Sequence, residues 1–207
     1  MTGVMHSISS FFICAVLAVF AQNAIFSRSL GVSRLIKIVV VDDAANALMF
    51  GFLICSVQVV AAPLGWLANS LLADFSLRSA VRPLVLVICS ALAYLFVRLC
   101  VLHSARLSDW DARDEALDML PSATFNCAVL GAMMVSATQS YTLAQTVGFG
   151  FGTGVGYLMA LLVVNEAEEK LKGEAVPPSF RGLPINLVYI GILAMAIYGF
   201  TGHMVAI

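Results

Sequence analysis

Cys127 is the residue of this chain whose type and surroundings are best suited to chemistry. It lies in the segment Asn126–Gly131, shortly after Pro121, and no charged residue occurs within five positions on either side of it. A cysteine thiolate is a soft ligand that binds soft metal centres such as iron–sulfur clusters. Because the surrounding residues are small and apolar, such a centre would lie inside a membrane. We therefore take Cys127 as the candidate cofactor-binding residue and metal ligand.

No second group of residues has a spacing that indicates catalysis. The other residues that could carry chemistry are Cys14, Cys55, Cys89, Cys100, His6, His103 and His203. These cysteines lie in apolar runs, where cysteine usually packs as a small hydrophobic residue, and a disulfide framework is not expected. The histidines are dispersed near the ends of apolar segments, and neither a paired-cysteine motif nor a nucleophile–base pair is present. We therefore assign no catalytic residue to this chain.

The composition predicts an integral membrane protein. Of the 207 residues, 61% are hydrophobic and 11% are charged, whereas soluble domains contain about 25% charged residues. The net charge of −1 gives no reason to expect a nucleic-acid partner. A helix needs about 20 apolar residues to cross a bilayer. Apolar windows predict six such helices, at about residues 8–27, 46–68, 81–102, 121–138, 146–165 and 183–204.

These helices form one predicted all-α membrane domain over residues 1–207, built from two inverted three-helix repeats, at about 1–105 and 119–207. Three helices per half force opposite orientations on the two halves. A short internal similarity, Asn23–Phe26 with Cys127–Leu130, supports the repeat. Polar residues in spans one and four make these two the candidates for broken helices, and span four is either a crossing or a re-entrant element.

The charges of the loops predict the topology. Nine of the eleven Lys and Arg residues lie in the loops after spans one, three and five, with Arg98 at the edge of its loop: Arg28, Arg34, Lys37, Arg98, Arg106, Arg113, Lys170, Lys172 and Arg181. The positive-inside rule places these loops in the cytoplasm and both termini outside. Two of the loops are also acidic. Their acids either form solvated helix faces with pairs such as Glu166–Lys170 and Glu168–Lys172, or a docking surface for a soluble partner.

Alternating glycines in span five predict close helix packing. Gly148, Gly152 and Gly156 share one helix face, and Gly150 and Gly154 share another. Small residues four positions apart allow helix backbones to approach closely. A phosphate-binding loop is excluded, since neither a preceding strand nor a following Lys-Ser/Thr pair is present.

Four segments in the second half resemble the RnfA/NqrE family, the six-helix membrane subunits of the Rnf and Nqr redox-driven ion pumps. The segments are 120–131, 148–156, 176–182 and 199–202. The resemblance implies a multi-pass subunit of the bacterial inner membrane, paired with a paralogous six-helix subunit in inverted orientation and with other subunits of the complex. It also implies that Cys127 ligates a [2Fe–2S] cluster shared with the paired subunit, while electrons cross the membrane and Na⁺ or H⁺ is moved. No flavin is expected on this chain.

The first half departs from the family pattern. The pattern there is Asn-x-x-x-Ser-Arg-x-Leu-Gly-x-Cys-Pro-Phe and then Val-Ser-Lys, whereas this chain passes from Asn23–Gly31 directly to Val32-Ser33-Arg34. The segment that carries the first-half cysteine is therefore absent. This leaves an alternative function, a redox-inactive membrane scaffold or small transporter that kept the fold and lost the cluster. Asp42 and Asp43 also have no family counterpart, and they either begin a helix at the membrane interface or bind a cation.

Overall fold

The computed structural model describes residues 2–41, 44–103, 110–171 and 176–201, and these residues form helices joined by turns. The helices are α1 (Thr2–Val19), α2 (Val32–Val41), α3 (Ala44–Leu71), α4 (Arg78–His103), α5 (Trp110–Thr124), α6 (Cys127–Thr138), α7 (Leu143–Leu171), the 3₁₀ helix η1 (Pro178–Phe180) and α8 (Leu183–Thr201). Asp42 and Asp43, with their two alternative roles, lie outside the described residues.

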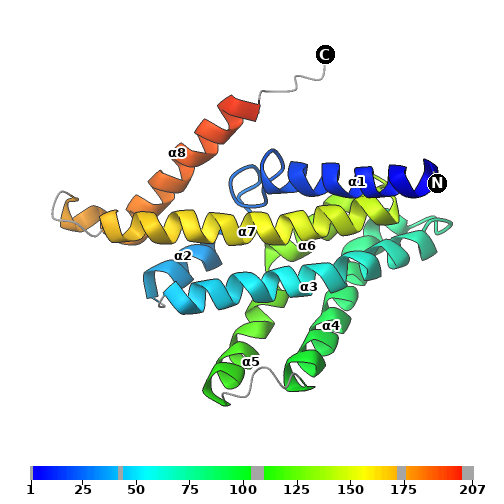
Figure 1. Ribbon diagram of the computed structural model, residues 1–207, viewed down its shortest axis with the longest axis horizontal. Coiled ribbons are helices and arrows are strands. Elements are labelled where there is room, and N and C mark those ends of the chain that lie inside the picture. The colour runs from blue at the N-terminus through cyan, green and yellow to red at the C-terminus, as the bar shows by residue number, and fades with distance from the viewer. Residues whose placement is uncertain (1, 42–43, 104–109, 172–175, 202–207) are drawn as a thin grey trace.

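Helix α7 is the central element of the molecule. Figure 1 shows α7 along the longest axis, with α1 on one side of it and α3 on the other, while α4 and α5 extend away from α3. Extensive contacts join α7 to both α1 and α3. Helix α8 turns away from the bundle, and it has far fewer contacts with α7 and α2.

The apolar helices identify a multi-helix membrane protein. Segments Asn46–Leu71, Arg78–His103 and Leu143–Glu168 are long and apolar enough to span a bilayer. The α5–α6 pair meets the same criterion as one span bent by 44°, and two shorter apolar helices cover Val4–Val19 and Leu183–Gly199. These elements correspond in position to the six predicted spans. Large apolar side chains such as Leu92, Phe96 and Leu99 of α4 are exposed, as expected for surfaces that face lipid.

The first predicted span ends earlier than expected. Helix α1 stops at Val19, and residues 20–31 form turns rather than the helix predicted to residue 27. Asn23 explains the break. Its Nδ2 donates to the carbonyl oxygens of Val19 and Gly156, while its Oδ1 accepts from the backbone N–H groups of Ile25 and Phe26. One side chain thereby satisfies backbone groups that a helix would otherwise have paired.

The fourth predicted span is broken at Phe125 and Asn126. Pro121, placed by the sequence at its start, lies inside α5, and the acidic segment before it is helical from Trp110 rather than a loop. Helix α6 then begins at Cys127 with Asn126 as its N-cap, whose side chain accepts from the backbone N–H of Ala128. An N-cap asparagine is a strong helix start signal, so Asn126 fixes where the second segment begins.

Asn23 and Asn126 make the same local hydrogen bond at the two helix breaks. Asn23 and Asn126 are 103 residues apart, and each accepts a hydrogen bond from the N–H two residues later. A Cβ on Gly51 would touch Leu158, and a Cβ on Gly154 would touch Cys55. These two contacts show that α3 and α7 pack antiparallel. The inverted repeat itself stays a prediction.

Candidate functional site around Cys127

Cys127 lies where the two helix breaks meet. It is the first residue of α6, and its side chain is exposed. The backbone N–H of Gly31 donates to its Sγ at 3.0 Å. Gly31 is the last residue of the turns after α1, and α2 begins at the next residue. The point at which the family's first-half cysteine segment is missing therefore lies against Cys127.

A buried hydrogen-bond network holds this junction together. Nδ2 of Asn126 donates to the Tyr157 hydroxyl at 3.2 Å, and that hydroxyl donates to the Gly31 carbonyl oxygen at 3.1 Å. Tyr157 comes from α7 and has no solvent exposure. The network thus joins the turn before α2, the start of α6 and the middle of α7. Buried polar groups satisfied in this way give a site a defined geometry.

Gly31 cannot be replaced by a larger residue without a shift of its neighbours. Its φ of +81° lies in the left-handed region, which L-residues other than glycine occupy at a cost. A Cβ there would come within 2.7 Å of both Asn126 Oδ1 and Tyr157 Cε2. Leu30, its neighbour, packs against Gly131 of α6, where a Cβ would touch the Leu30 side chain.

Arg34 lies beside this network rather than in the solvated loop that the sequence predicts for it. From α2 it donates to Oγ of Ser122 on α5 at 2.8 Å, and its guanidinium carbon lies 5.6 Å from the centroid of the Phe50 ring. Phe50 in turn packs against Tyr157, with 6.2 Å between ring centroids. The cation is held in place by a hydroxyl and an aromatic face, which is a stabilising arrangement for arginine.

An apolar groove opens at Cys127. It has a volume of about 300 Å³ and lies between α4 and α6. Its lining residues are Pro83, Leu86, Val87, Cys127, Leu130, Gly131 and Met134. The thiol is therefore reachable from outside the bundle, along a surface that carries no charged side chain.

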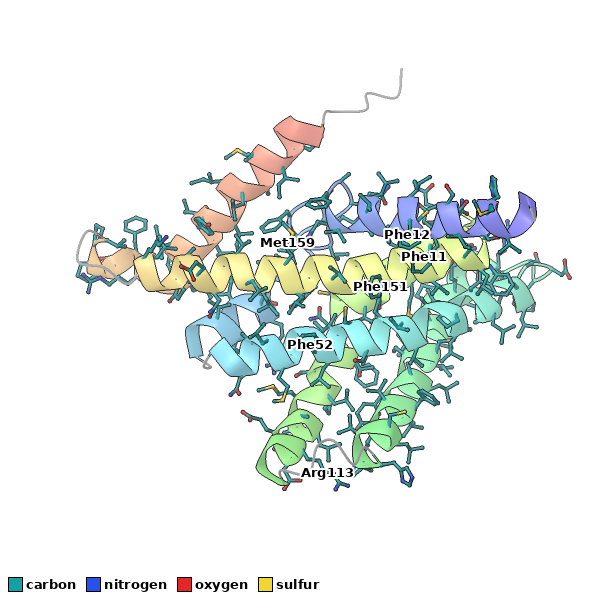
Figure 2. The ribbon with its side chains drawn as sticks, viewed as in Figure 1. Phe11, Phe12, Phe52, Arg113, Phe151 and Met159 are labelled. Atoms are coloured by element: carbon teal, nitrogen blue, oxygen red, sulfur yellow. The ribbon has the colours of Figure 1, made fainter. Side chains whose placement is uncertain are left out.

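The glycines of α7 divide between two neighbouring helices. Added Cβ atoms on Gly148 and Gly152 would collide with the backbone of Phe11 and Ala15 in α1, and one on Gly156 would come within 2.9 Å of Asn23 Nδ2. Gly150 and Gly154 face α3 instead. Next to the first contact, Phe11 stacks on Phe151 with 6.3 Å between ring centroids, and Figure 2 shows the two rings at the α1–α7 boundary.

The described residues do not fit a [2Fe–2S] half-site of two cysteines. Cys14 packs in a cluster with Ala132 and Phe149, Cys55 lies under Gly154, and Cys89 donates to the carbonyl oxygen of Leu64. Within the described part of the chain, no group of three or more His, Cys, Asp or Glu side chains is arranged to hold a metal. Cys127 is thus one thiolate, whereas the cluster takes four.

Comparison with known proteins places this fold in a family. The model of the family described as "Rnf-Nqr subunit, membrane protein" matches residues 11–204. The chain belongs to the Rnf-Nqr family. A subunit of the ion-translocating oxidoreductase complex of Syntrophotalea carbinolica is 31% identical over 186 residues, which cover 89% of this chain and 93% of that protein. A subunit of the Na⁺-translocating NADH-quinone reductase of Rhodopirellula baltica is 41% identical over 83 residues, 40% of this chain and 39% of that protein.

Some residues of this Rnf-Nqr site were not evident from the sequence. Tyr157 is one aromatic residue within an apolar helix, and nothing around it indicates a hydrogen bond to a residue 126 positions away. Asn126 stood out only as part of a similar segment, and its N-cap role follows from the break that the structure reveals. Gly31 was named only as the residue after which a segment of the family pattern is missing, and its contact with Cys127 was not predicted.

Proposed function

We propose that this Rnf-Nqr chain is the membrane subunit of an ion-translocating electron-transport complex in which electron passage is coupled to movement of Na⁺ or H⁺. The observation that carries the proposal is the meeting of the two helix breaks at Gly31 and Cys127. Discontinuous helices that face each other inside a bilayer are typical of coupled membrane transport. Oxidation of the substrate belongs to other subunits, since this chain shows no catalytic group among its described residues.

Cys127 is the residue through which the chain would contribute to a redox centre. Its thiol faces the groove between α4 and α6, so a paired subunit that covers this groove could share a cluster with it. Such a [2Fe–2S] cluster would need three ligands from other chains, because this chain offers one. We therefore assign no electron-transfer step to the residues of this chain alone.

The test is a comparison of cysteine variants in the assembled complex. The chain is co-expressed with its paired subunit, and iron content and EPR spectra are recorded for the wild type, Cys127→Ser and Cys100→Ser. Cys100 is an exposed cysteine on α4 and serves as the matched control. We expect a reduced-cluster signal that is lost only with Cys127→Ser. Retention of the full signal in Cys127→Ser would exclude the role of Cys127.

A redox-inactive scaffold is the second candidate function. The observation in its favour is that α2 begins directly after Gly31, which leaves no residue in the place of the first-half cysteine. Iron-free preparations of the intact pair, with this chain still bound to its partner, would support this candidate over the first.

The inner membrane and the orientation are part of the same proposal. With the loops after spans one, three and five in the cytoplasm, both termini lie outside. Alkaline phosphatase fused after Thr201 would then be active, and the same enzyme fused within residues 172–175 would be inactive. The reverse pattern of phosphatase activity would show that the chain has the opposite orientation in the membrane.

A further inference from the structure

A groove opens between α7 and α8 at the end of the apolar span Leu143–Glu168. Its volume of about 530 Å³ lies within the range of about 300–1,000 Å³ that ligand pockets have. Figure 1 shows that α8 diverges from α7 after their junction, and few contacts join the two helices. Part of the lining is exposed, so a molecule from the surrounding membrane can reach it.

The lining of this groove has an apolar part and a charged part. The apolar part consists of Leu162, Val163, Ala167 and Leu171. In the charged part, Glu166 and Lys170 are exposed and four positions apart on α7, so they share one helix face, and Tyr189 adds a half-buried ring from α8. Since the apolar span ends here, the charged part lies where the hydrocarbon layer meets the headgroup layer. An amphipathic molecule fits such a lining.

Glu168 does not line this groove. It was expected on a solvated helix face, paired with Lys172, yet its side chain is only 3% exposed, and Lys172 lies outside the described residues. Its Oε2 accepts from Nδ2 of Asn186 on α8, a side chain that is completely buried. This contact holds α8 against α7 three positions before Tyr189, so both walls of the groove have a defined position.

The charges in the groove select a zwitterionic ligand. A carboxylate and an ammonium group on one helix face are complemented by an ammonium and a phosphate that lie close together. Phosphatidylethanolamine carries these two groups on a short ethanolamine link, next to its acyl chains. We propose that the groove binds one phosphatidylethanolamine molecule, with its phosphate on Lys170, its ammonium on Glu166 and an acyl chain along Leu162.

The long side chain of Lys170 suits this placement of the headgroup. Side chains on a helix lean towards its N-terminus, so the Lys170 stem can bring its ammonium to the level of Glu166. A headgroup that lies flat in the membrane surface can then meet both charges. A pair between Glu166 and Lys170 themselves is weak at an exposed position, so a headgroup can replace it.

Other membrane components complement this lining less well. Phosphatidylglycerol brings no cation to Glu166, and the ammonium of phosphatidylcholine is fully methylated and has no N–H to donate. An apolar helix of a partner subunit would cover Leu162 but would leave the two charged side chains against an apolar surface, which is costly.

The experiment measures lipid binding to the full-length chain in detergent by native mass spectrometry. Phosphatidylethanolamine, phosphatidylcholine and phosphatidylglycerol with identical acyl chains are each titrated against the monodisperse protein. We expect one phosphatidylethanolamine per chain, bound about tenfold more tightly than phosphatidylcholine, which is the effect of one lost charge-assisted hydrogen bond. Equal affinity for the three lipids overturns the site.

Two variants separate the two headgroup contacts. Glu166→Gln should abolish the preference for phosphatidylethanolamine over phosphatidylcholine and leave the binding of phosphatidylcholine unchanged. Lys170→Met should weaken the binding of all three lipids about tenfold, because all three carry the phosphate. Asp118→Asn on α5 and Lys37→Met on α2 are the matched controls, because both residues are exposed and neither lines the groove. A preference for phosphatidylethanolamine that survives in Glu166→Gln overturns the proposal.

The lipid site goes beyond the proposed function, since lipid binding by the chain alone needs neither a redox centre nor a partner. The same titration on the chain assembled with its paired subunit tests the remaining occupant. Retention of the bound phosphatidylethanolamine in that assembly supports the lipid site. Its loss would overturn the lipid site and assign the groove to the paired subunit.

Discussion

The backbone N–H of Gly31 donates a hydrogen bond to Sγ of Cys127 at 3.0 Å, although 96 positions separate the two residues in the sequence. Backbone N–H groups that point at a thiolate sulfur stabilise its negative charge and are a recognised means of tuning sulfur-ligated metal centres. Gly31 is also the residue after which this chain lacks the segment that the family resemblance implies, so the contact places that point of the chain against Cys127.

Replacing Gly31 by alanine should destabilise the protein strongly. The left-handed backbone alone costs about 1–2 kcal/mol, and a Cβ within 2.7 Å of Asn126 and Tyr157 adds a steric cost. We expect a total loss of about 2–4 kcal/mol, measured by thermal unfolding in detergent.

Gly182→Ala is the matched control for that substitution. Gly182 has almost the same backbone conformation, with φ of +83°, and no atom lies within 4 Å of an added Cβ. The difference between the two variants therefore isolates the packing at the Cys127 junction. Equal losses of stability in the two variants would mean that this junction is not tightly packed.

Removal of the Tyr157 hydroxyl should loosen the turn that contacts Cys127 through Gly31. Tyr157→Phe leaves the Gly31 carbonyl and the Asn126 amide without their shared partner, at a cost of about 1–3 kcal/mol. In a variant with Cys127 as the only cysteine, maleimide labelling should become faster. Tyr189→Phe, at a half-buried tyrosine of α8, should leave the labelling rate unchanged. An unchanged rate in Tyr157→Phe would show that the network does not hold the turn against the thiol.

Enlarging a glycine at the α1–α7 contact should separate these helices. In Gly152→Ala the new methyl group meets the Ala15 backbone, which cannot move aside as a side chain could. We expect destabilisation of about 1–3 kcal/mol, as is usual for overpacking. Gly191→Ala on α8 has open space around it and should be neutral or stabilising by up to about 1 kcal/mol. Similar melting temperatures for Gly152→Ala and the wild type would contradict the close helix contact.

Insertion of Leu-Cys-Pro-Phe after Gly31 should bring a second thiol next to Cys127. The inserted cysteine would follow the residue whose N–H already touches Cys127 Sγ. We expect mild oxidation to form a disulfide within the chain, detected as a loss of two free thiols by mass spectrometry. The same insertion with serine in place of cysteine is the control. If both thiols stay reduced and react independently, the inserted cysteine does not lie beside Cys127.

Most of the helical architecture could be predicted from the sequence, because long apolar runs can hardly form anything but helices inside a bilayer. The glycine spacing likewise indicated which faces of α7 would pack closely against neighbouring helices. The breaks were harder to place. The hydrogen bonds of Asn23 at the end of α1 include one to Gly156, 133 positions away, and no local pattern reports such a partner.

The predictions for two charged residues, Arg34 and Glu168, were wrong for the same physical reason. Arg34 and Glu168 were assigned to solvated positions because charged side chains usually avoid the interior. Each makes a hydrogen bond with a side chain from another helix, Arg34 with Ser122 and Glu168 with Asn186. Only the tertiary structure reveals those neighbours.

The contact between α1 and α7 has a mechanical consequence. At Gly148 and Gly152, one turn apart, the α1 backbone lies directly against α7, and at these two positions no α7 side chain separates the helices. Packed helices can slide past one another by small shear movements, and a direct backbone contact at two successive turns opposes such sliding. The pair should therefore behave as a single rigid strut, and any cycle of opening and closing would have to be carried by parts attached less firmly, of which α8 is the clearest example.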